Sequence, residues 1–294
     1  MRNSLLIICL TLLSLPLFSL DKKPNWVNFQ EAKMFYESGN FREALDYYLQ
    51  VTKSPTPNPE AEYMIGLLYL EEGELEIAEE QILKAISLSH YLQVKEDLMF
   101  YKYSLAKVYL LKDDYDSYVS TLKDIIGKSS IDLQEVRDQR AYYDTILESG
   151  VNRLLHLYRK DADNVLNARI YLGYYYNSIG KYLESVNYLL SPMLSLVTEV
   201  INDNIKQDRE YVFISMEQFF KEVGKNKRVQ EYFEENDFYK LFYYLGESFY
   251  GLGLKEQANE FWELLVNSNL ESKWINKAKK QLKDPSLEEW KFVY

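Results

Sequence analysis

The sequence predicts an all-α fold assembled from repeated helical hairpins. One observation is a set of small, aromatic and apolar residues that recurs in the same order after 34 residues: Ala32, Phe35, Gly39, Phe41, Ala44 and Tyr48, then Gly66, Tyr69, Gly73, Leu75, Ala78 and Ile82. The other is the composition, because 47% hydrophobic and 27% charged residues exclude a disordered chain and a membrane bundle. A fixed period of this length indicates a repeat architecture, in which each unit packs on its neighbours.

This period and order of residues resemble the tetratricopeptide repeat (TPR). The resemblance implies a right-handed superhelical solenoid of antiparallel helix pairs, with about five clear and two degenerate repeats. It also implies a scaffold that binds other proteins.

Repeats 1 to 3 are expected over residues 22–130. In the first repeat Gly39 supplies the positive φ of the turn, and the small Ala44 lets the paired helices approach closely. The prolines within residues 55–59 end this hairpin and start the next, since proline cannot continue a helix interior. In the third repeat Asp113 stands where the first two have a turn glycine.

The rest of the chain continues the pattern with less regular spacing. The intervals between clear repeats have lengths that fit degenerate hairpins, and a final helix would shield the last repeat from solvent. The expected segments are a degenerate hairpin at 131–165, a TPR repeat at 166–195, a degenerate hairpin at 196–238, a TPR repeat with a capping helix at 239–283, and a C-terminal tail at 284–294.

The end of the last repeat carries a second, shorter resemblance. Ser272-Lys273-Trp274 followed by Ala278 is similar to the ending of TPR units in bacterial cell-envelope proteins. The tail beyond contains three aromatic residues, which either fold back on the last repeat or form a short docking tail: Trp290, Phe292 and Tyr294.

Residues 1–20 begin with Arg2 and continue with an apolar run from Leu5 to Leu15, before Pro16. This pattern is typical of a secretory signal peptide, and the run is shorter than the roughly 20 residues of a transmembrane helix. We expect a cleaved signal peptide and a periplasmic protein, with an uncleaved N-terminal anchor as the alternative. Cys9 lies within the apolar run and is the chain's one cysteine, so no disulfide can form within the chain.

The net charge of −11 restricts the classes of molecule that the chain is expected to bind. It argues against nucleic acid, whose phosphates are neutralised by lysine and arginine. It also disfavours an anionic membrane, so membrane contact is expected only through residues 1–20 if they are uncleaved. The acidity indicates either a solubilising surface or recognition of a basic partner.

Catalytic and metal-binding patterns do not stand out in the sequence. His90 and His156 have no adjacent ligand pattern, and zinc spacing motifs are missing. Gly251-Leu252-Gly253 lacks the third glycine and the preceding strand of a phosphate loop, so a helix–helix turn is expected there. We therefore expect no enzyme, no catalytic residue, no cofactor and no metal site.

In TPR proteins the first helix of each pair lines a concave groove, and the resemblance assigns groove positions in this chain. The clamp that chaperone-binding TPRs use for a terminal carboxylate is not assembled within one repeat pair. Tyrosine and aliphatic residues predominate instead, and they provide rigid contact area at small entropic cost. These residues either receive an extended or helical partner segment or are covered by flanking degenerate repeats. The candidates are Trp26, Phe29, Lys33, Tyr36, Tyr63, Leu67, Leu70, Phe100, Tyr103, Lys107, Tyr174, Asn177, Tyr243 and Tyr250.

The functional expectation is an exported, non-catalytic adaptor that binds another protein in a periplasmic or envelope assembly. Two alternatives stay open. One is a periplasmic ligand- or peptide-binding protein, and the other is a membrane-tethered scaffold that faces the cytoplasm. The sequence leaves the oligomeric state open.

Overall fold

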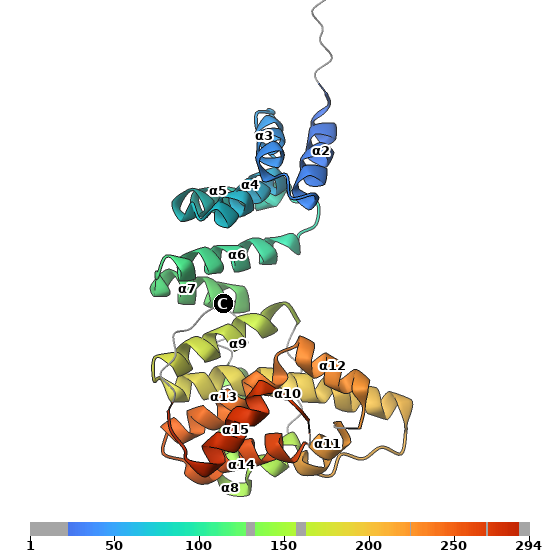
Figure 1. Cartoon of the computed structure of the whole chain (residues 1–294), viewed down its shortest axis with the longest axis vertical. Helices are drawn as coiled ribbons and strands as arrows, with labels where there is room; N and C mark the ends of the chain where they lie inside the picture. Colours follow the sequence, from blue (N-terminus) through green and yellow to red (C-terminus); the bar gives the residue numbers. More distant parts are fainter. Residues whose placement is uncertain (1–22, 128–132, 157–162, 224, 269, 288–294) are drawn as a thin grey trace, which may run out of the picture. The chain divides into compact units, whose positions relative to one another are not determined.

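The computed structural model describes residues 23–127, 133–156, 163–223, 225–268 and 270–287, and these residues form helices and turns without a β-strand (Figure 1). The predicted all-α class is confirmed. The chain divides into two compact units, unit 1 up to Val108 and unit 2 from Tyr109 onward. The division falls inside the third predicted repeat, so the three-repeat segment expected at 22–130 is not one compact unit.

Unit 1 contains the first two hairpins in the predicted places. The first is α2 (Asn25–Glu37) with α3 (Phe41–Thr52), and the second is α4 (Pro59–Glu72) with α5 (Leu75–Ser87). A short 3₁₀ helix, η2 (Ser89–Tyr91), leads to α6 (Asp97–Leu111), within which the unit ends. The small, aromatic and apolar residues of the repeat form the core between these helices, including Ala32, Ala44, Tyr48 and Ile65.

The turns of unit 1 follow from local chemistry. Gly39 and Gly73 have φ of +78° and +81°, a left-handed conformation that glycine adopts without a Cβ penalty. Helix α4 begins with Pro59 at its first position, while the Asn58 side chain accepts a hydrogen bond from the Ala61 amide. The turn glycines and the proline that the sequence analysis singled out therefore form the turns and the helix start of these repeats.

Unit 2 contains the second helix of the third hairpin and the remaining elements. Its elements are α7 (Tyr115–Ile126), α8 (Leu133–Ser149), η4 (Val151–His156), α9 (Asp163–Ser178), α10 (Tyr182–Gln207), α11 (Met216–Val223), α12 (Lys227–Glu235), α13 (Phe238–Gly251), α14 (Lys255–Asn267) and α15 (Lys273–Lys283). Helices α9 and α10 pair across a turn at Gly180, and α13 and α14 pair across a turn at Gly253. The predicted capping helix is α15, which packs on α13 and α14.

The predicted hairpin at 131–165 differs from the structure. Within the described part of this interval, α8 is followed by the 3₁₀ helix η4 and not by a second α-helix. Gly150 ends α8 with φ of +76°, and the Val151 amide donates a hydrogen bond to Glu260 Oε2 of α14 at 2.6 Å. A carboxylate from a distant helix thus holds the chain at the point where a hairpin would turn.

The predicted repeat end at residue 195 is also wrong. Helix α10 continues for 26 residues to Gln207 and passes through Pro192. Proline in a helix interior loses a backbone hydrogen bond, but here the surrounding turns are almost completely buried, and packing offsets that loss. The degenerate pair expected at 196–238 is confined to α11 and α12, and Gly224 between these helices lies outside the described residues.

The core of unit 2 is a cluster of aromatic rings. Phe233 and Phe238 stack with ring centroids 4.0 Å apart, and Phe220 contacts Phe242 edge-on at 5.0 Å. Aromatic pairs in these geometries contribute beyond the area they bury. The cluster therefore joins α11 and α12 to α13 despite their irregular sequence. The tail aromatics beyond residue 287, the segment at 1–20 and Cys9 all lie outside the described residues.

Candidate functional site

The first helices of unit 1 present equivalent side chains at the predicted groove positions. We call this set the first-helix face, and it consists of Trp26, Phe29, Lys33 and Tyr36 on α2, Tyr63 and Leu67 on α4, and Phe100, Tyr103 and Lys107 on α6. Trp26 is 70% exposed and Phe100 is 63% exposed, although both are large aromatic residues. Leu70, also predicted to line the groove, is buried, so its assignment is corrected to the core.

Tyr63, a member of this face, connects α4 to α6. Its hydroxyl is hydrogen bonded to the Ser104 hydroxyl at 2.8 Å, and its ring stacks on Tyr101 with centroids 4.0 Å apart. Burial raises the pKa of the Tyr63 phenol above its ordinary value, although the bond to Ser104 opposes this. The ring is thus held in one orientation by contacts on two sides.

Acidic groups border the same face. Burial raises the pKa of the Glu60 carboxyl, and the nearby Asp97 carboxylate raises it further. Two carboxyl groups that share a site disfavour one another's charge, so a cation placed between them would be stabilised. On α2, Lys33 and Glu37 form an exposed ion pair at 3.8 Å.

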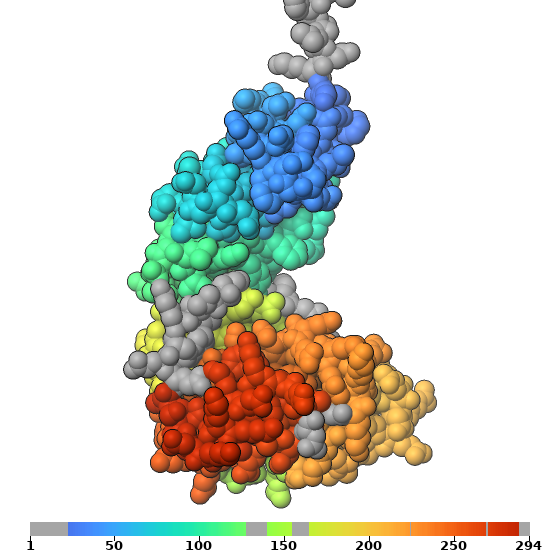
Figure 2. Space-filling view, viewed as in Figure 1, coloured from blue at the N-terminus to red at the C-terminus, as the bar shows by residue number. Residues whose placement is uncertain are grey.

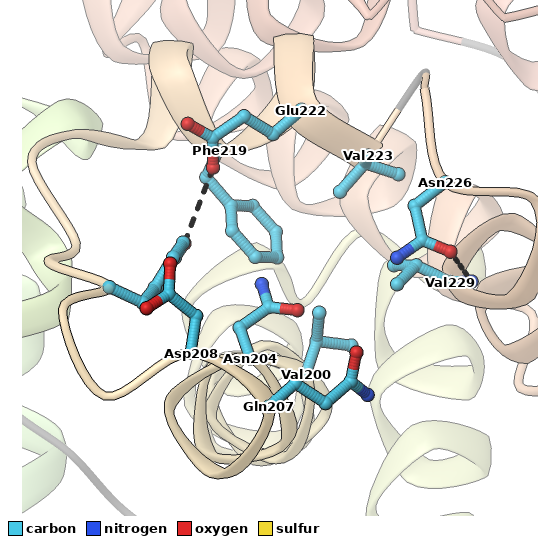
Figure 3. A pocket seen from close by; sticks show the side chains of 10 residues that line it. Val200, Asn204, Gln207, Asp208, Phe219, Glu222, Val223, Asn226 and Val229 are labelled. Atoms are coloured by element: carbon cyan, nitrogen blue, oxygen red, sulfur yellow. Dashed lines mark hydrogen bonds between the residues drawn. The ribbon is translucent and has the colours of Figure 1, made fainter.

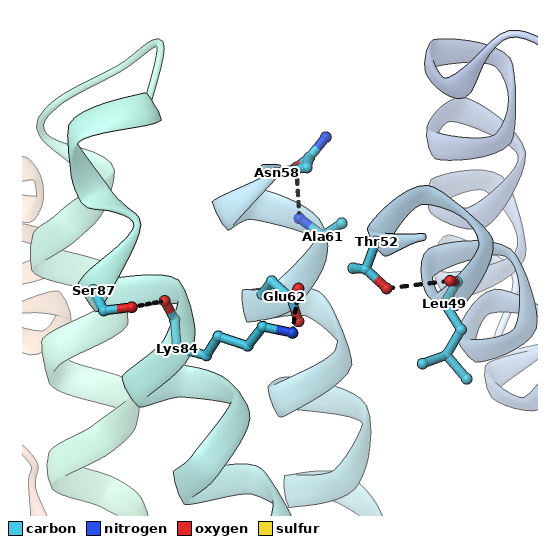
Figure 4. A network of polar contacts seen from close by, with 7 residues as sticks. All are labelled: Leu49, Thr52, Asn58, Ala61, Glu62, Lys84 and Ser87. Carbon is cyan, nitrogen blue, oxygen red and sulfur yellow. Dashed lines mark hydrogen bonds and ion pairs between the residues drawn. The ribbon is translucent and has the colours of Figure 1, made fainter. Parts of the chain in front are cut away.

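An ion pair with one buried partner joins the two helices of the second hairpin. The Glu62 carboxylate of α4 accepts a contact from Lys84 Nζ of α5 at 2.7 Å, as Figure 4 shows. The Glu62 side chain is only 6% exposed, whereas that of Lys84 is 52% exposed. Water therefore reaches the lysine, and the carboxylate depends on it for charge compensation. Sequence reasoning missed this pair, because the pattern of a single helix does not show which carboxylate the neighbouring helix will cover.

In unit 2 three predicted groove residues are buried, and the groove assignment is corrected for them. Tyr174, Asn177 and Tyr243 are 1%, 4% and 0% exposed. Asn177 Nδ2 donates to Ser248 Oγ at 2.9 Å, which in turn donates to Ser185 Oγ at 2.9 Å. This chain of polar contacts links α9, α13 and α10, so these residues position helices.

The capping helix explains the burial of Tyr243. The ring of Trp274 on α15 lies 5.6 Å from that of Tyr243, and Gln281 Nε2 donates to the Tyr243 hydroxyl at 3.0 Å. Tyr250 remains partly exposed, and its hydroxyl donates to the Pro285 carbonyl oxygen at 3.1 Å. The predicted cap therefore covers part of the predicted groove.

A pocket of about 210 Å³ opens between α10, α11 and α12 (Figure 3). Val200 and Phe219 are among its apolar lining residues, and the amides of Asn204 and Asn226 add polar groups. An adjoining pocket of about 170 Å³ extends toward Arg228 and Tyr232. The sequence carried no signal for these pockets, because they depend on the unexpected extension of α10.

Unit 1 has a wider polar hollow of about 540 Å³ at the open end of its first hairpin. Lys23, Asn28, Tyr47 and Lys53 are among the residues that line it. Lys23 Nζ also pairs with Glu31 at 2.8 Å. The side chains that line this hollow are mostly polar, which differs from the apolar lining common in small-molecule sites.

The described residues contain no cluster that could hold a metal ion, meaning three or more histidine, cysteine, aspartate or glutamate side chains placed together. In the same part of the chain, His90 is exposed and its ring lies 4.0 Å from that of Tyr91. No helix in the described ranges combines the length and the apolar character needed to cross a membrane.

Comparison with known proteins finds similarity over nearly the whole chain at low identity. No protein-family model matches. An uncharacterized protein of Borreliella burgdorferi is 22% identical over 321 positions, which cover 97% of this chain and 98% of the relative. The crystal structure of MamA matches with a TM-score of 0.47 and 16% identity over 92% of this chain and 98% of that one. A putative kinesin light chain of Podosopora anserina with nearly identical TPR-like repeats matches with a TM-score of 0.45 and 13% identity over 88% and 96% of the two chains.

Proposed function

We propose that this chain, an all-α repeat protein of TPR type, is a non-catalytic scaffold that binds a segment of another protein on the first-helix face of unit 1. The observation that carries this proposal is the exposure of Trp26 on α2 and of Phe100 on α6, together with Tyr63 of α4, whose orientation is held by Ser104 and Tyr101. Large aromatic residues that are already ordered lose little entropy on binding, which makes them effective anchors. Glu60 and Asp97 would receive a basic side chain of the partner.

We further propose that the protein is exported and works in a periplasmic or envelope assembly. The support is the signal-peptide pattern of residues 1–20 and the resemblance of the chain around Trp274 to envelope TPR proteins. Sequencing the N-terminus of the protein purified from its own cells tests this proposal. A start near Leu20 or Asp21 in an envelope fraction agrees with export, whereas intact residues 1–20 would favour a membrane-tethered scaffold.

The binding proposal is tested by placing a photo-reactive phenylalanine analogue at Phe100 of the full chain and cross-linking in intact cells. A matched control carries the analogue at Leu83, an exposed apolar residue on α5 outside the first-helix face. We expect Phe100 to yield one reproducible protein adduct that Leu83 does not give, and purified partner should compete for it. Equal adducts from both positions would contradict the proposal.

One observation favours a second candidate function, the binding of a small ligand. It is the pocket between α10, α11 and α12, which combines an apolar lining with amide groups. Native mass spectrometry of the purified protein tests it. A small molecule that is retained by the normal chain and lost on Asn204→Leu would support ligand binding, and a mass equal to that of the bare chain would count against it.

A further inference from the structure

The polar hollow of unit 1 lies between the start of α2 and the end of α3, and its volume is about 540 Å³. Asn25 Nδ2, at the first position of α2, donates a hydrogen bond to the Val51 carbonyl oxygen of α3 at 3.2 Å and so ties the two helix ends together. Figure 2 shows this hairpin, in blue, at the surface of unit 1. The hollow is therefore bounded by two joined helices and has the volume of a typical ligand site.

Amide side chains are the commonest group in this hollow. Asn25, Asn28 and Gln50 line it together with Tyr47, and no carboxylate occurs among the described lining residues. Amide and phenol side chains can both donate and accept hydrogen bonds, as the hydroxyl groups of a sugar do. An apolar ligand would leave these side chains without partners, which costs free energy. The lining therefore favours a ligand covered with hydroxyl groups.

Asn28 is the residue of this lining that most needs a partner. It is only 8% exposed, and its side chain makes no hydrogen bond with any described residue. Most polar side chains buried to this extent in proteins are hydrogen bonded, and an unpaired buried amide destabilises the folded state. Because Asn28 lines the hollow, a ligand bound there would supply the missing hydrogen bonds.

The hollow also carries positive charge, in contrast to the net charge of −11 of the whole chain. Lys53 is exposed and forms no ion pair within the described residues. Lys23 Nζ lies 5.7 Å from the centre of the Tyr47 ring and pairs with Glu31, which offsets part of its charge. Helix α2 adds its positive end, because its first turn contains no acidic residue and no side chain caps it. An anionic group would thus be attracted to Lys53 and the start of α2.

We propose that this hollow binds a sugar that carries an anionic group, with sugar hydroxyl groups on Asn28 and Gln50 and the anionic group on Lys53 and the first backbone amides of α2. The site uses none of the residues of the first-helix face and goes beyond the scaffold function.

Other anions fit the hollow less well. A bare inorganic anion would leave Asn28 and most of the volume unused. A nucleotide would need an exposed aromatic or apolar face for its base. Tyr47, the one aromatic ring in the described lining, is already stacked on Phe35 with ring centroids 5.3 Å apart.

Ligand-observed NMR of the full chain tests the proposal with two probes, glucose 6-phosphate and glucuronate. They differ in whether a phosphate or a carboxylate is the anionic group, so the comparison also shows which of the two the hollow prefers. We expect the better probe to bind about tenfold more tightly than glucose, which lacks the charge, and than inorganic phosphate, which lacks the sugar.

Three variants locate the binding site. Asn28→Leu should weaken binding of the better probe about tenfold and raise the melting temperature, because it removes an unpaired buried amide; a residue kept for packing alone would lower that temperature. Lys53→Gln should weaken binding about fivefold. The matched control, Lys279→Gln on α15 of unit 2, removes one exposed positive charge elsewhere and should change the affinity by less than about twofold.

Several results would overturn the proposal. They are equal binding of glucose or of inorganic phosphate, an unchanged affinity in Asn28→Leu, and equal weakening by Lys53→Gln and Lys279→Gln. If Asn28→Leu does not fold, Gln50→Ala at an exposed position of α3 takes its place, and an unchanged affinity would again overturn the proposal. Absence of sugar binding while Phe100 still cross-links its partner would refute this inference alone, whereas sugar binding without a specific Phe100 adduct would refute only the proposed role of the first-helix face.

Discussion

Gly66 of α4 stands where the two helices of the second hairpin come closest. A Cβ atom at this position would lie 2.6 Å from Ile82 Cγ1 and 3.3 Å from the Ala78 carbonyl oxygen of α5. The first of these contacts is far inside van der Waals distance. The small residue in the repeat pattern is therefore a condition for the observed helix spacing and has no part in the turn.

We predict that Gly66→Ala destabilises the protein by about 1–3 kcal/mol, since an added methyl group must push α5 away or force Ile82 off its rotamer. Urea unfolding of the full chain measures the effect. In the double variant Gly66→Ala with Ile82→Ala, the clash is removed and the combined loss should be smaller than the sum of the single losses. Additive losses would show that the contact is not the cause.

Asp113 occupies the turn position that glycine holds in the first two hairpins, and it has φ of +55°. This left-handed conformation is costly for most residues, and aspartate tolerates it better than most. The Tyr115 hydroxyl donates a hydrogen bond to Asp113 Oδ1 at 2.7 Å, which helps to hold the turn. The turn geometry of the repeat is thus kept without its usual residue.

Substitutions at this position should therefore separate backbone strain from side-chain contacts. We predict that Asp113→Gly changes the free energy of unfolding by less than about 0.5 kcal/mol, because relief of strain offsets the lost hydrogen bond and the more flexible unfolded chain. Asp113→Val should destabilise by about 1–2 kcal/mol, since a β-branched residue is strongly strained at positive φ. Chemical denaturation of both variants measures these changes. Equal changes in the free energy of unfolding for the two variants would argue against backbone strain at this position.

At the scale of the helices, the ion pair between Glu62 and Lys84 joins α4 to α5 (Figure 4). The carboxylate is almost fully buried, so removing the lysine would leave a charge with little compensation. The lysine is about half exposed, so water weakens the attraction between the two charges relative to a fully buried pair. Removing the lysine should therefore cost more stability than removing the glutamate, because only the first change leaves a buried charge without its partner.

We predict that Lys84→Met destabilises the protein by about 1–3 kcal/mol, and that adding Glu62→Leu recovers most of the loss. The recovery is expected because an apolar pair no longer contains a buried charge. Thermal unfolding of the single and double variants at one pH measures both effects. A double variant less stable than Lys84→Met would contradict the role assigned to Glu62.

At the scale of the whole molecule, buried tyrosines recur in both units. Burial raises the pKa of Tyr48 to about 12, and it also raises the pKa values of Tyr101 in unit 1 and of Tyr174 and Tyr239 in unit 2. An unfolded chain ionises its tyrosines near pH 10. Each buried phenol therefore keeps its proton in the folded state when the unfolded state would lose it.

We therefore predict that the buried tyrosines leave the free energy of unfolding unchanged below about pH 9. As the pH rises through 10 toward 12, the free energy of unfolding should fall. The unfolded state binds fewer protons in that range, so alkali favours unfolding. Urea midpoints at pH 9 and pH 11 measure the loss. Tyr48→Phe should show a smaller loss between these two pH values, and an unchanged loss would mean that Tyr48 contributes little.

Sequence reasoning was accurate where structure depends on nearby residues. Hairpins α2–α3, α4–α5 and α13–α14 and the cap α15 lie where the period and the turn glycines placed them. The same reasoning predicted the first-helix face from Trp26 to Lys107, and its role in binding stays a prediction. It could not distinguish exposed from buried groove positions, because Phe29 and Tyr243 hold equivalent places in their repeats, yet Phe29 is only partly buried and Tyr243 is fully buried.

The sequence by itself determined the helical class, the repeat period and the turns, because small residues, prolines and positive-φ positions act within a few residues of themselves. Only the tertiary structure decided that α10 continues past residue 195, that η4 follows α8, and that Tyr174 and Tyr243 are covered. These outcomes depend on contacts between residues far apart in the chain, such as Val151 with Glu260 and Asn177 with Ser248. Burial is a property of the assembled fold, and no local pattern encodes which distant side chain will supply it.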